Sequence, residues 1–464
     1  MEHQPGPRAA AGAQRPVGLN RATLPEDEAA GLPARRFAFS LVTRVLDQRV
    51  TLEEAGEALA TVAGRMEARD AAFGRAIAYA SLRHKGALEA LLKRFIERPL
   101  PEHGLAASRV LLTGAAELMI LNGKPHAAVD GANRLALAVR EAKPFKSLIN
   151  AVLRRVTREG AEVWESLDHA RANVPDWLWT RWTTAYGEET ARAIAAAHET
   201  PAPLDVTLKD PAAAPDWAAK LNANPVGTGT LRLEKSGPVE TLPGFDEGAW
   251  WVQDAAAAIP AQVLLSHFRD PAAAEIADLC AAPGGKTMQL AASGATVTAV
   301  DSSGPRLKRL AENLRRTGLT AHIEKADIRS FAPEKPFDAI LLDAPCSATG
   351  TIRRHPELPW IRDDGAVTRP AAVTSQLLDA AFAMLKPGGV LVFAVCSLET
   401  EEGEDQIAAF LARTPAAGLR PIDPAIFGLP PESATPAGLR LIPSMKAELG
   451  GLDGFFVAAF VRSA

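Results

Sequence analysis

"EIADLCAAPGGKT" (residues 275–287) passes from an apolar run through a glycine-containing turn into a stretch compatible with a helix. This order is typical of a strand, a loop and a helix in a parallel α/β sheet. Gly284 and Gly285 let a ligand approach the backbone, and the start of the following helix favours a carboxylate or phosphate. The turn half-matches the P-loop G-x-x-x-x-G-K-[ST], but Cys280 stands where that motif needs glycine. We find no second nucleoside-triphosphatase motif, so that class of protein is disfavoured.

The same alternation of strand and helix continues to the end of the chain. Strands are predicted at residues 275–280, 296–301, 321–327, 337–344 and 389–397. Helices are predicted at residues 253–268, with Asp254 as the N-cap, and at 304–318 and 374–389. The last segment, about 439–464, predicts an antiparallel hairpin at one edge of the sheet. Residues 251–464 are therefore predicted to form an α/β Rossmann-like domain.

Three further segments precede this domain, so the predicted fold class is multidomain. Residues 1–34 are rich in Ala, Gly, Pro and Arg and are predicted to be a disordered tail. Residues 35–160 repeat apolar positions every three or four residues, which predicts an all-α bundle. Residues 161–250 combine a Trp-rich helical stretch with short strand patterns and are predicted to be a small α+β domain. The tryptophans at 177–182 are expected in its core.

Composition and charge narrow the class of protein. The 464 residues are 47% hydrophobic and 23% charged, as in ordinary globular chains, and no long apolar run predicts a membrane span or a signal peptide. Residues 35–160 hold 21 Lys and Arg against 13 Asp and Glu, although the whole chain has a net charge of −4. Such a basic segment suggests a polyanion-binding module; an Arg-rich solvated surface is the alternative. Three scattered cysteines favour a reducing cytoplasm, and no Cys/His cluster has metal-ligand spacing.

Acidic residues close the second and third predicted strands of the α/β domain. Asp301 stands where a carboxylate would accept hydrogen bonds from ribose hydroxyls, and Asp327 where it could reach an adenine edge. Either could instead cap the element that follows. The G-x-G-x-x-G fingerprint of nicotinamide-dinucleotide domains is absent from the sequence. Together these features predict a site for S-adenosylmethionine.

Two cysteines lie where the fourth and fifth predicted strands pass into loops. Asp343 closes the fourth strand and Pro345 fixes φ before Cys346, while Cys396 closes the fifth strand, so both thiols should face one cleft. Singly, each cysteine could be a small apolar filler. A methyl donor beside an acid and two thiols suits methylation of cytosine C5, because a thiolate that adds to C6 makes C5 nucleophilic. This chemistry alone does not choose which thiol attacks.

At these residues the chain resembles the RsmB/NOP/Sun family of RNA 5-methylcytosine methyltransferases. "DLCAAPGGKT" (278–287), "DAPCSATGTIRRHPELPW" (343–360) and "FAVCSLETEEGEDQI" (393–407) carry the resemblance. Residues 35–160 resemble a NusB-like RNA-binding domain through "RVLLTGAAELMILNGKPHAAVDGANRLA" (109–136) and "KPFKSLINAVLRRV" (143–156). Family members with this architecture modify small-subunit ribosomal RNA. The resemblance therefore implies a class I methyltransferase fold and 16S ribosomal RNA as substrate.

The resemblance also implies roles for individual residues. Cys396 is implied as the nucleophile and Cys346 as the thiol that assists product release, with Asp343 and Lys286 beside them. DNA cytosine methyltransferases instead attack with the cysteine of the fourth-strand Pro-Cys motif. The implied S-adenosylmethionine-binding set is Cys280, Ala281, Ala282, Pro283, Gly284, Gly285, Lys286, Asp301, Asp327 and Asp343.

Other features of the sequence are less specific. Arg353, Arg354 and His355 follow the Cys346 loop and are candidates for contacts with substrate phosphates. The acids of "ETEEGED" (399–405) are expected to begin the last helix, where they suit its dipole. We expect a cytoplasmic, monomeric enzyme that acts on RNA without a metal or a membrane. A transfer-RNA methyltransferase of the same family and a non-catalytic RNA-binding factor remain alternatives.

Overall fold

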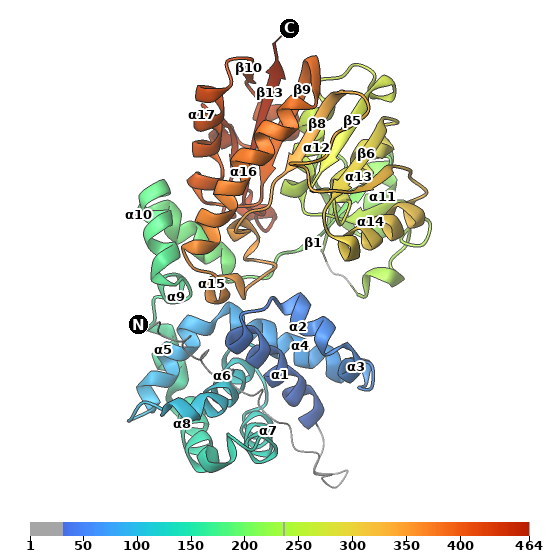
Figure 1. Cartoon of the computed structure of the whole chain (residues 1–464). Helices are drawn as coiled ribbons and strands as arrows, with labels where there is room; N and C mark the ends of the chain where they lie inside the picture. Colours follow the sequence, from blue (N-terminus) through green and yellow to red (C-terminus); the bar gives the residue numbers. More distant parts are fainter. Residues whose placement is uncertain (1–30, 235–236, 464) are drawn as a thin grey trace, which may run out of the picture. The chain divides into compact units, whose positions relative to one another are not determined.

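The computed structural model describes residues 31–234 and 237–463 (Figure 1). The chain divides into two compact units, residues 1–168 and 169–464. Most of the predicted tail lies outside the described residues, and the first helix already begins at Leu32. Each unit is described separately below.

The described part of the first unit is helical, as predicted. Its helices are α1 (Leu32–Gln48), α2 (Leu52–Ala58), α3 (Ala60–Ala63), α4 (Ala68–Arg83), α5 (Lys85–Phe95), α6 (Leu105–Met119), α7 (Pro125–Ala138) and α8 (Lys146–Glu165). Pro125 is the first residue of α7, a position where its missing N–H costs nothing. Arg35 on α1 pairs with Glu117 on α6, and both side chains are buried. Helix α8 continues past residue 160, where the sequence predicts the end of the helical domain. The two units instead divide after residue 168.

The second unit begins with two helices and a small sheet. The helices are α9 (His169–Ala172) and α10 (Asp176–His198); α11 (Ala214–Leu221) packs against the sheet. Among the described residues, β1 (Leu204–Leu208), β2 (Ala223–Gly227), β3 (Thr230–Leu233) and β4 (Trp250–Val252) form a sheet in the order β2-β3-β1-β4. Its pairings are antiparallel. The prediction missed β2, whose Pro225 obscures the strand pattern.

A second, larger sheet forms the centre of this unit. Its described strands are β5 (Glu275–Leu279), β6 (Thr296–Asp301), β7 (His322–Lys325), β8 (Phe337–Asp343), β9 (Leu385–Val395), β10 (Ala417–Arg420), β11 (Ala434–Thr435), β12 (Gly438–Leu441) and β13 (Phe455–Arg462). Their order is β11-β12-β13-β9-β8-β5-β6-β7, with β10 also paired to β13. The five neighbouring strands β9, β8, β5, β6 and β7 are parallel. Strand β13 runs antiparallel to its neighbours β9 and β12. The predicted strands and terminal hairpin are therefore confirmed.

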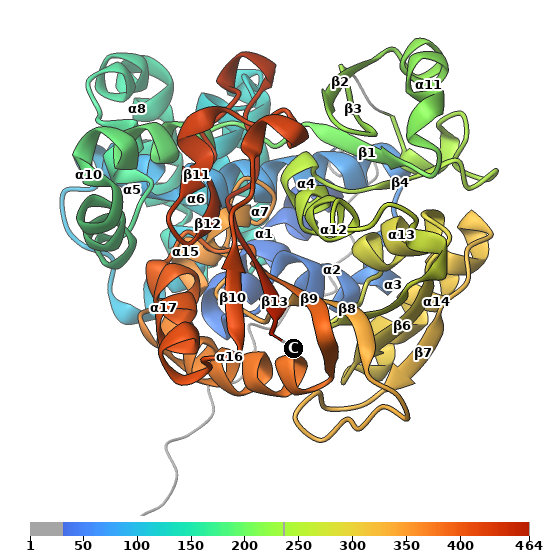
Figure 2. The same cartoon turned by 90° about the horizontal axis from the view of Figure 1, so that it is seen from above.

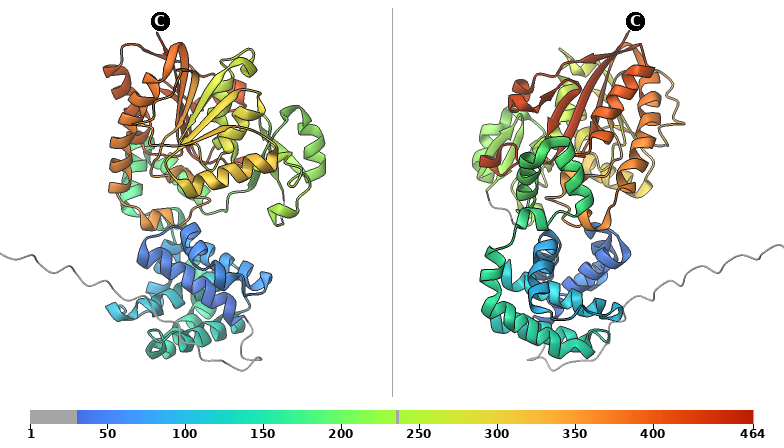
Figure 3. Two further views of the ribbon diagram at one scale, coloured as in Figure 1. Left: turned by 45° about the vertical axis from the view of Figure 1, so that its right-hand side comes forward. Right: turned by 90° about the vertical axis from the view of Figure 1, so that its left-hand side faces the viewer.

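Helices cover both faces of the large sheet (Figure 2). They are α12 (Ala255–Leu265), α13 (Gly285–Ala292), α14 (Gly304–Thr317), α16 (Gly365–Ala383) and α17 (Glu404–Arg413); the short helix α15 (Leu358–Ile361) lies in the segment between β8 and α16. Buried side chains place α12, α13 and α14 on one face and α16 and α17 on the other. In the right-hand view of Figure 3, α16 and α17 stand to one side of the red strands. Asp254 caps α12 by accepting from Ala256 N–H at 2.8 Å, as predicted.

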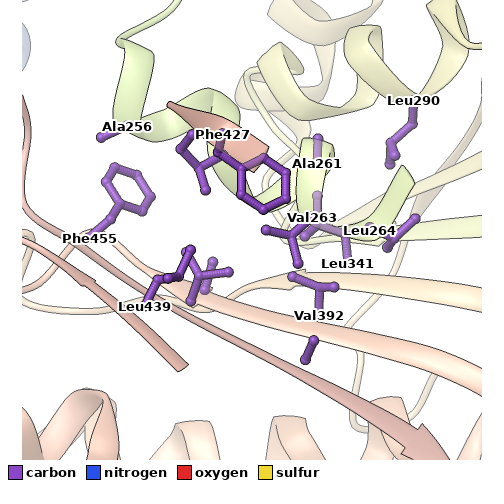
Figure 4. Close-up of a cluster of buried hydrophobic side chains, with 14 of the residues drawn as sticks. Ala256, Ala261, Val263, Leu264, Leu290, Leu341, Val392, Phe427, Leu439 and Phe455 are labelled. Atoms are coloured by element: carbon purple, nitrogen blue, oxygen red, sulfur yellow. The ribbon is translucent and has the colours of Figure 1, made fainter. Parts of the chain in front are cut away.

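The core on the α12 face explains why the central strands of the large sheet have continuous apolar sequences. Val263 and Leu264 of α12 lie against Leu341 of β8, Val392 of β9 and Leu439 of β12 (Figure 4). Alternate residues of β8 and β9 face α16 and α17, so these two strands are buried on both sides. Among residues 31–234 and 237–463, no helix combines the length and hydropathy needed to cross a bilayer.

Candidate active site

The candidate site lies at the carboxyl ends of the parallel strands. Strand order reverses between β5 and β8, and ligands of open α/β sheets bind beyond the strand ends at such a reversal. A cavity of about 340 Å³ opens there. Its lining includes predicted residues from five different strand ends: Cys280, Asp301, Asp327, Asp343, Cys346 and Cys396. The structure thus brings together residues that are up to 116 positions apart in sequence (396 minus 280).

The loop between β5 and α13 is fixed against β6. Cys280 has a positive φ of 61°, and Ala281 N–H donates to the Val300 carbonyl at 3.1 Å. Gly284 has φ 107°, and a Cβ there would lie 3.0 Å from Leu310, so the position suits glycine on both grounds. Burial raises the pKa of Cys280 to about 12, so this thiol is protonated at neutral pH.

Asp301 and Asp327 differ in how their carboxylates are engaged. Asp301 is buried and accepts from Ala282 N–H at 3.2 Å and from Ser303 N–H at 2.8 Å. Arg306 Nη1 also lies 3.3 Å from Asp301 Oδ2, so Oδ1 is the oxygen that keeps a lone pair for another donor. Asp327 is half-exposed, and hydrogen bonds from Arg329 lower its pKa to about 2. Both residues therefore present acceptors at the cavity.

Lys286 and Asp343 form an ion pair within the site. Lys286 Nζ lies 2.8 Å from Asp343 Oδ2, and the ammonium also lies 5.3 Å from the centre of the Phe455 ring. Burial lowers the pKa of Lys286, but the charge and the hydrogen bond of Asp343, with smaller contributions from Asp278 and Cys396, outweigh burial and raise the pKa above its usual value. Lys286 is thus a fixed positive charge that interacts with both Asp343 and the Cys396 sulfur.

The two thiols predicted to share a cleft are in contact. The Sγ atoms of Cys346 and Cys396 lie 3.5 Å apart, on loops that follow the paired strands β8 and β9. The hydrogen bond with Cys396 and burial both raise the pKa of Cys346 well above its ordinary value. Cys346 is therefore a protonated thiol at neutral pH, able to donate S–H to a thiolate at Cys396.

Two family models match the chain at different ends. Residues 268–461 match 16S rRNA methyltransferase RsmB/F, and residues 32–158 match the NusB family. The chain is 35% identical over 441 residues to ribosomal RNA small subunit methyltransferase B of Cronobacter sakazakii, covering 91% of this chain and 98% of that protein. The chain belongs to the RsmB/F methyltransferase family.

Solved structures of other proteins share the fold of this chain. The RsmB/F chain is similar to the crystal structure of PH0851, with a TM-score of 0.69, 22% identity, and coverage of 95% of this chain and 100% of that one. A methyltransferase homolog protein from Pyrococcus horikoshii has a TM-score of 0.51 and 27% identity, covering 61% of this chain and 93% of that one.

The structure corrects the prediction for two arginines of this RsmB/F member. Arg353 is 1% exposed; it donates to the Gly450 carbonyl at 2.6 Å and lies 3.7 Å from Asp453. Arg354 pairs with Asp254 at 2.5 Å and with Asp453 at 2.8 Å. Both charges are paired with acids inside the unit. Local sequence spacing did not reveal this pairing, because Asp254 and Asp453 lie about 100 residues away in sequence. The side chain of His355 is 43% exposed and remains a candidate for RNA contact.

The sequence interpretation also missed a buried acid beside the thiols. Glu402 is 1% exposed and accepts hydrogen bonds from Ser347 and Ser397, the residues that follow the two cysteines. The sequence predicts its acidic run at the start of the last helix; Glu404 and Asp405 do begin α17, but Glu402 lies in the turn before it. The repeated Cys-Ser pair in two loops of one cleft was the available signal.

Proposed function

We propose that this chain methylates C5 of a cytosine in 16S ribosomal RNA, with Cys396 as the covalent nucleophile and Cys346 as the thiol that assists release. As a member of the RsmB/F family it is an RNA methyltransferase that uses S-adenosylmethionine, which supplies an electrophilic methyl group. The observation that carries the proposal is the 3.5 Å contact between two thiols inside a cavity that also holds Asp301, Asp327 and Asp343.

The residues present fit the methyl donor. The cavity of about 340 Å³ holds acceptors from two acids on neighbouring strands, β6 and β7, and an apolar wall that includes Ile328 and Leu377. Asp301 would hold the ribose hydroxyls, and Asp327 would take donors from the adenine edge. The backbone of the Cys280–Lys286 loop would bound the remainder of the site.

The thiols and the ion pair divide the work on the cytosine. The Cys396 thiolate forms a bond to C6, and Asp343 stabilises the adduct at the base N3 by hydrogen bonding or proton donation. C5 then takes the methyl group. As its proton passes to solvent water, the electrons of the C5–H bond re-form the C5–C6 double bond, and the C6–S bond breaks to return Cys396 as a thiolate. Cys346, as a protonated thiol next to Cys396, donates to the sulfur as it leaves. Lys286 holds Asp343 in place and stabilises negative charge on Cys396.

Separating the two thiols tests this assignment. Cys396→Ser should form no covalent RNA adduct and have almost no turnover, because a hydroxyl is far less ionised than a thiol near neutral pH. Cys346→Ala should still attack and methylate but release slowly, so that a protein–RNA complex survives denaturing electrophoresis when donor and RNA are present. The double variant should form no adduct. An adduct that persists in Cys396→Ser and is missing from Cys346→Ala would reverse the roles.

We assign RNA binding to the NusB-like unit. A polar groove of about 610 Å³ lies between α7 and α8, lined by His126, Arg154 and Arg158 among other residues. Asp130, the acid in this lining, pairs with Arg134 at 2.6 Å, which leaves the groove with net positive charge. Cations in a groove suit RNA phosphates.

The setting and the exact RNA are also proposals. We propose a cytoplasmic monomer; light scattering of the purified chain tests its oligomeric state. Bisulfite sequencing of ribosomal and transfer RNA from a deletion strain distinguishes the substrates: loss of one 16S site supports the proposal, and loss confined to transfer RNA contradicts it.

A further inference from the structure

Glu402 joins the loops that carry the two thiols. Its Oε1 accepts from Ser347 N–H at 2.8 Å, and its Oε2 accepts from the hydroxyls of Ser347 and Ser397, each at 2.5 Å. Ser347 follows Cys346, and Ser397 follows Cys396. One carboxyl group therefore binds the residue next to each thiol.

Neighbouring hydrogen bonds make the connection rigid. The hydroxyls of Ser347 and Ser397 lie 3.2 Å apart, and Ser397 Oγ also accepts from Glu399 N–H at 3.0 Å. Thr349 Oγ1 accepts from Leu398 N–H at 3.0 Å, which crosses between the loops a second time. Ser347, Thr349 and Ser397 are at most 1% exposed, so water does not compete for these bonds.

A buried carboxyl in this position needs a reason, since burying it is costly. Packing alone would be served by an apolar side chain of similar size. Three hydrogen bonds that all come from residues beside a cysteine indicate that what Glu402 fixes is the geometry of the thiols. Glu402 itself does not line the cavity, so it acts through its partners.

We propose that Glu402 is a positioning residue that sets the separation and direction of Cys346 and Cys396 through Ser347 and Ser397. This inference rests on the roles proposed above for the two thiols. Because each serine adjoins one thiol, each arm should control one step: the Ser397 arm the attack on C6, and the Ser347 arm the release of the methylated product.

Variants of the full-length chain test the two arms separately, with adduct formation and adduct decay followed on 16S ribosomal RNA by denaturing electrophoresis. Ser397→Ala should slow adduct formation by about tenfold or more, since a misplacement of 1 Å can cost on the order of a hundredfold. Ser347→Ala should form the adduct at nearly the wild-type rate and accumulate it. Ser433→Ala is the matched control: it removes a fully buried hydroxyl that donates to the Pro430 carbonyl at 2.6 Å, away from the cavity.

Substitution of the acid supplies the rescue test. Glu402→Ala should impair both steps, and Glu402→Gln should recover most of the loss, because its amide oxygen still accepts from Ser347 N–H. If Glu402→Ala does not fold, the serine variants still decide. The proposal is overturned if both serine variants slow the same step equally or if neither differs from Ser433→Ala. A wild-type chain that forms no adduct through Cys396 would instead refute the thiol roles, and the inference with them.

Discussion

Asp278 shows how a single buried residue links the donor loop to pH. It lies on β5 and is 1% exposed; Thr287 Oγ1 donates to its Oδ2 at 2.6 Å. Its Oδ1 has no hydrogen-bond partner within the described part of the chain. Burial raises the pKa of Asp278 to about 7, with Asp343 and Asp301 adding to the rise against Thr287 and Lys286.

The raised pKa of Asp278 predicts a direction for stability. An unfolded aspartate titrates near about 3.9, so between that pH and about 7 the folded state holds an extra proton. The resulting stability is complete below the unfolded pKa and is lost as pH rises through about 7. Asp278→Asn keeps an acceptor for Thr287 and removes this loss. Thermal unfolding should show the melting temperature of the variant rising relative to wild type between pH 5 and pH 8; a difference that does not change with pH contradicts the assignment.

Residues of the site differ in how far the sequence could predict them. Asp301 and Asp343 end β6 and β8, and Cys346 and Cys396 lie just after β8 and β9. Because parallel strands end at one edge of a sheet, the proximity of these residues followed from the pattern. The burial of Arg353 did not follow, because its partners Gly450 and Asp453 lie about 100 residues further along the chain. Charge pairing of this kind depends on which loops meet in the folded chain, and it cannot be predicted from local sequence spacing.

Among the elements, β13 is the one that shapes the thiol loops. It enters the sheet antiparallel beside β9, with Phe456 opposite Val395. The turn before it brings Gly454 against Gly350, with Gly454 N–H donating to the Gly350 carbonyl at 2.7 Å. Gly350 N–H in turn donates to the Cys396 carbonyl at 3.0 Å. The sequence predicted the terminal hairpin, but that this hairpin abuts the Cys346 loop required the strand order.

The close approach of Gly350 and Gly454 gives a prediction at this scale. A Cβ on Gly350 would lie 2.0 Å from the Gly454 carbonyl oxygen, so Gly350→Ala must displace the loop between the two thiols. We expect a loss of about 1–3 kcal/mol in unfolding free energy, as for other overpacked sites, and slower adduct formation. Gly227→Ala is the control, because a Cβ there meets nothing within 4 Å. Equal denaturant midpoints and equal adduct rates for the two variants would contradict the argument.

Over the whole molecule, charge separates the two units. Residues 35–160 carry a net charge of about +8, from 21 basic and 13 acidic residues, whereas the full chain carries −4. This distribution supports the proposed binding of RNA by the NusB-like unit, while the methyltransferase unit supplies a cavity in which acids outnumber arginines. This division of labour was visible in the sequence because net charge needs no knowledge of contacts. The groove between α7 and α8 could not be predicted in the same way, because it depends on how the two helices pack.

That division predicts how RNA affinity responds to salt. Each phosphate neutralised by a cation releases counterions, with a log–log slope of roughly −0.7 per contact on single strands. In the full-length chain, Arg154→Ala/Arg158→Ala should weaken binding to 16S ribosomal RNA fragments and make the slope shallower by up to about 1.4. Arg75→Ala on α4 removes an exposed arginine that does not line the groove, and it should leave the slope nearly unchanged. Fluorescence anisotropy over a potassium chloride series measures both quantities. If the double variant keeps the wild-type slope, the groove does not hold phosphates, and the positive charge of this unit is a solvated surface.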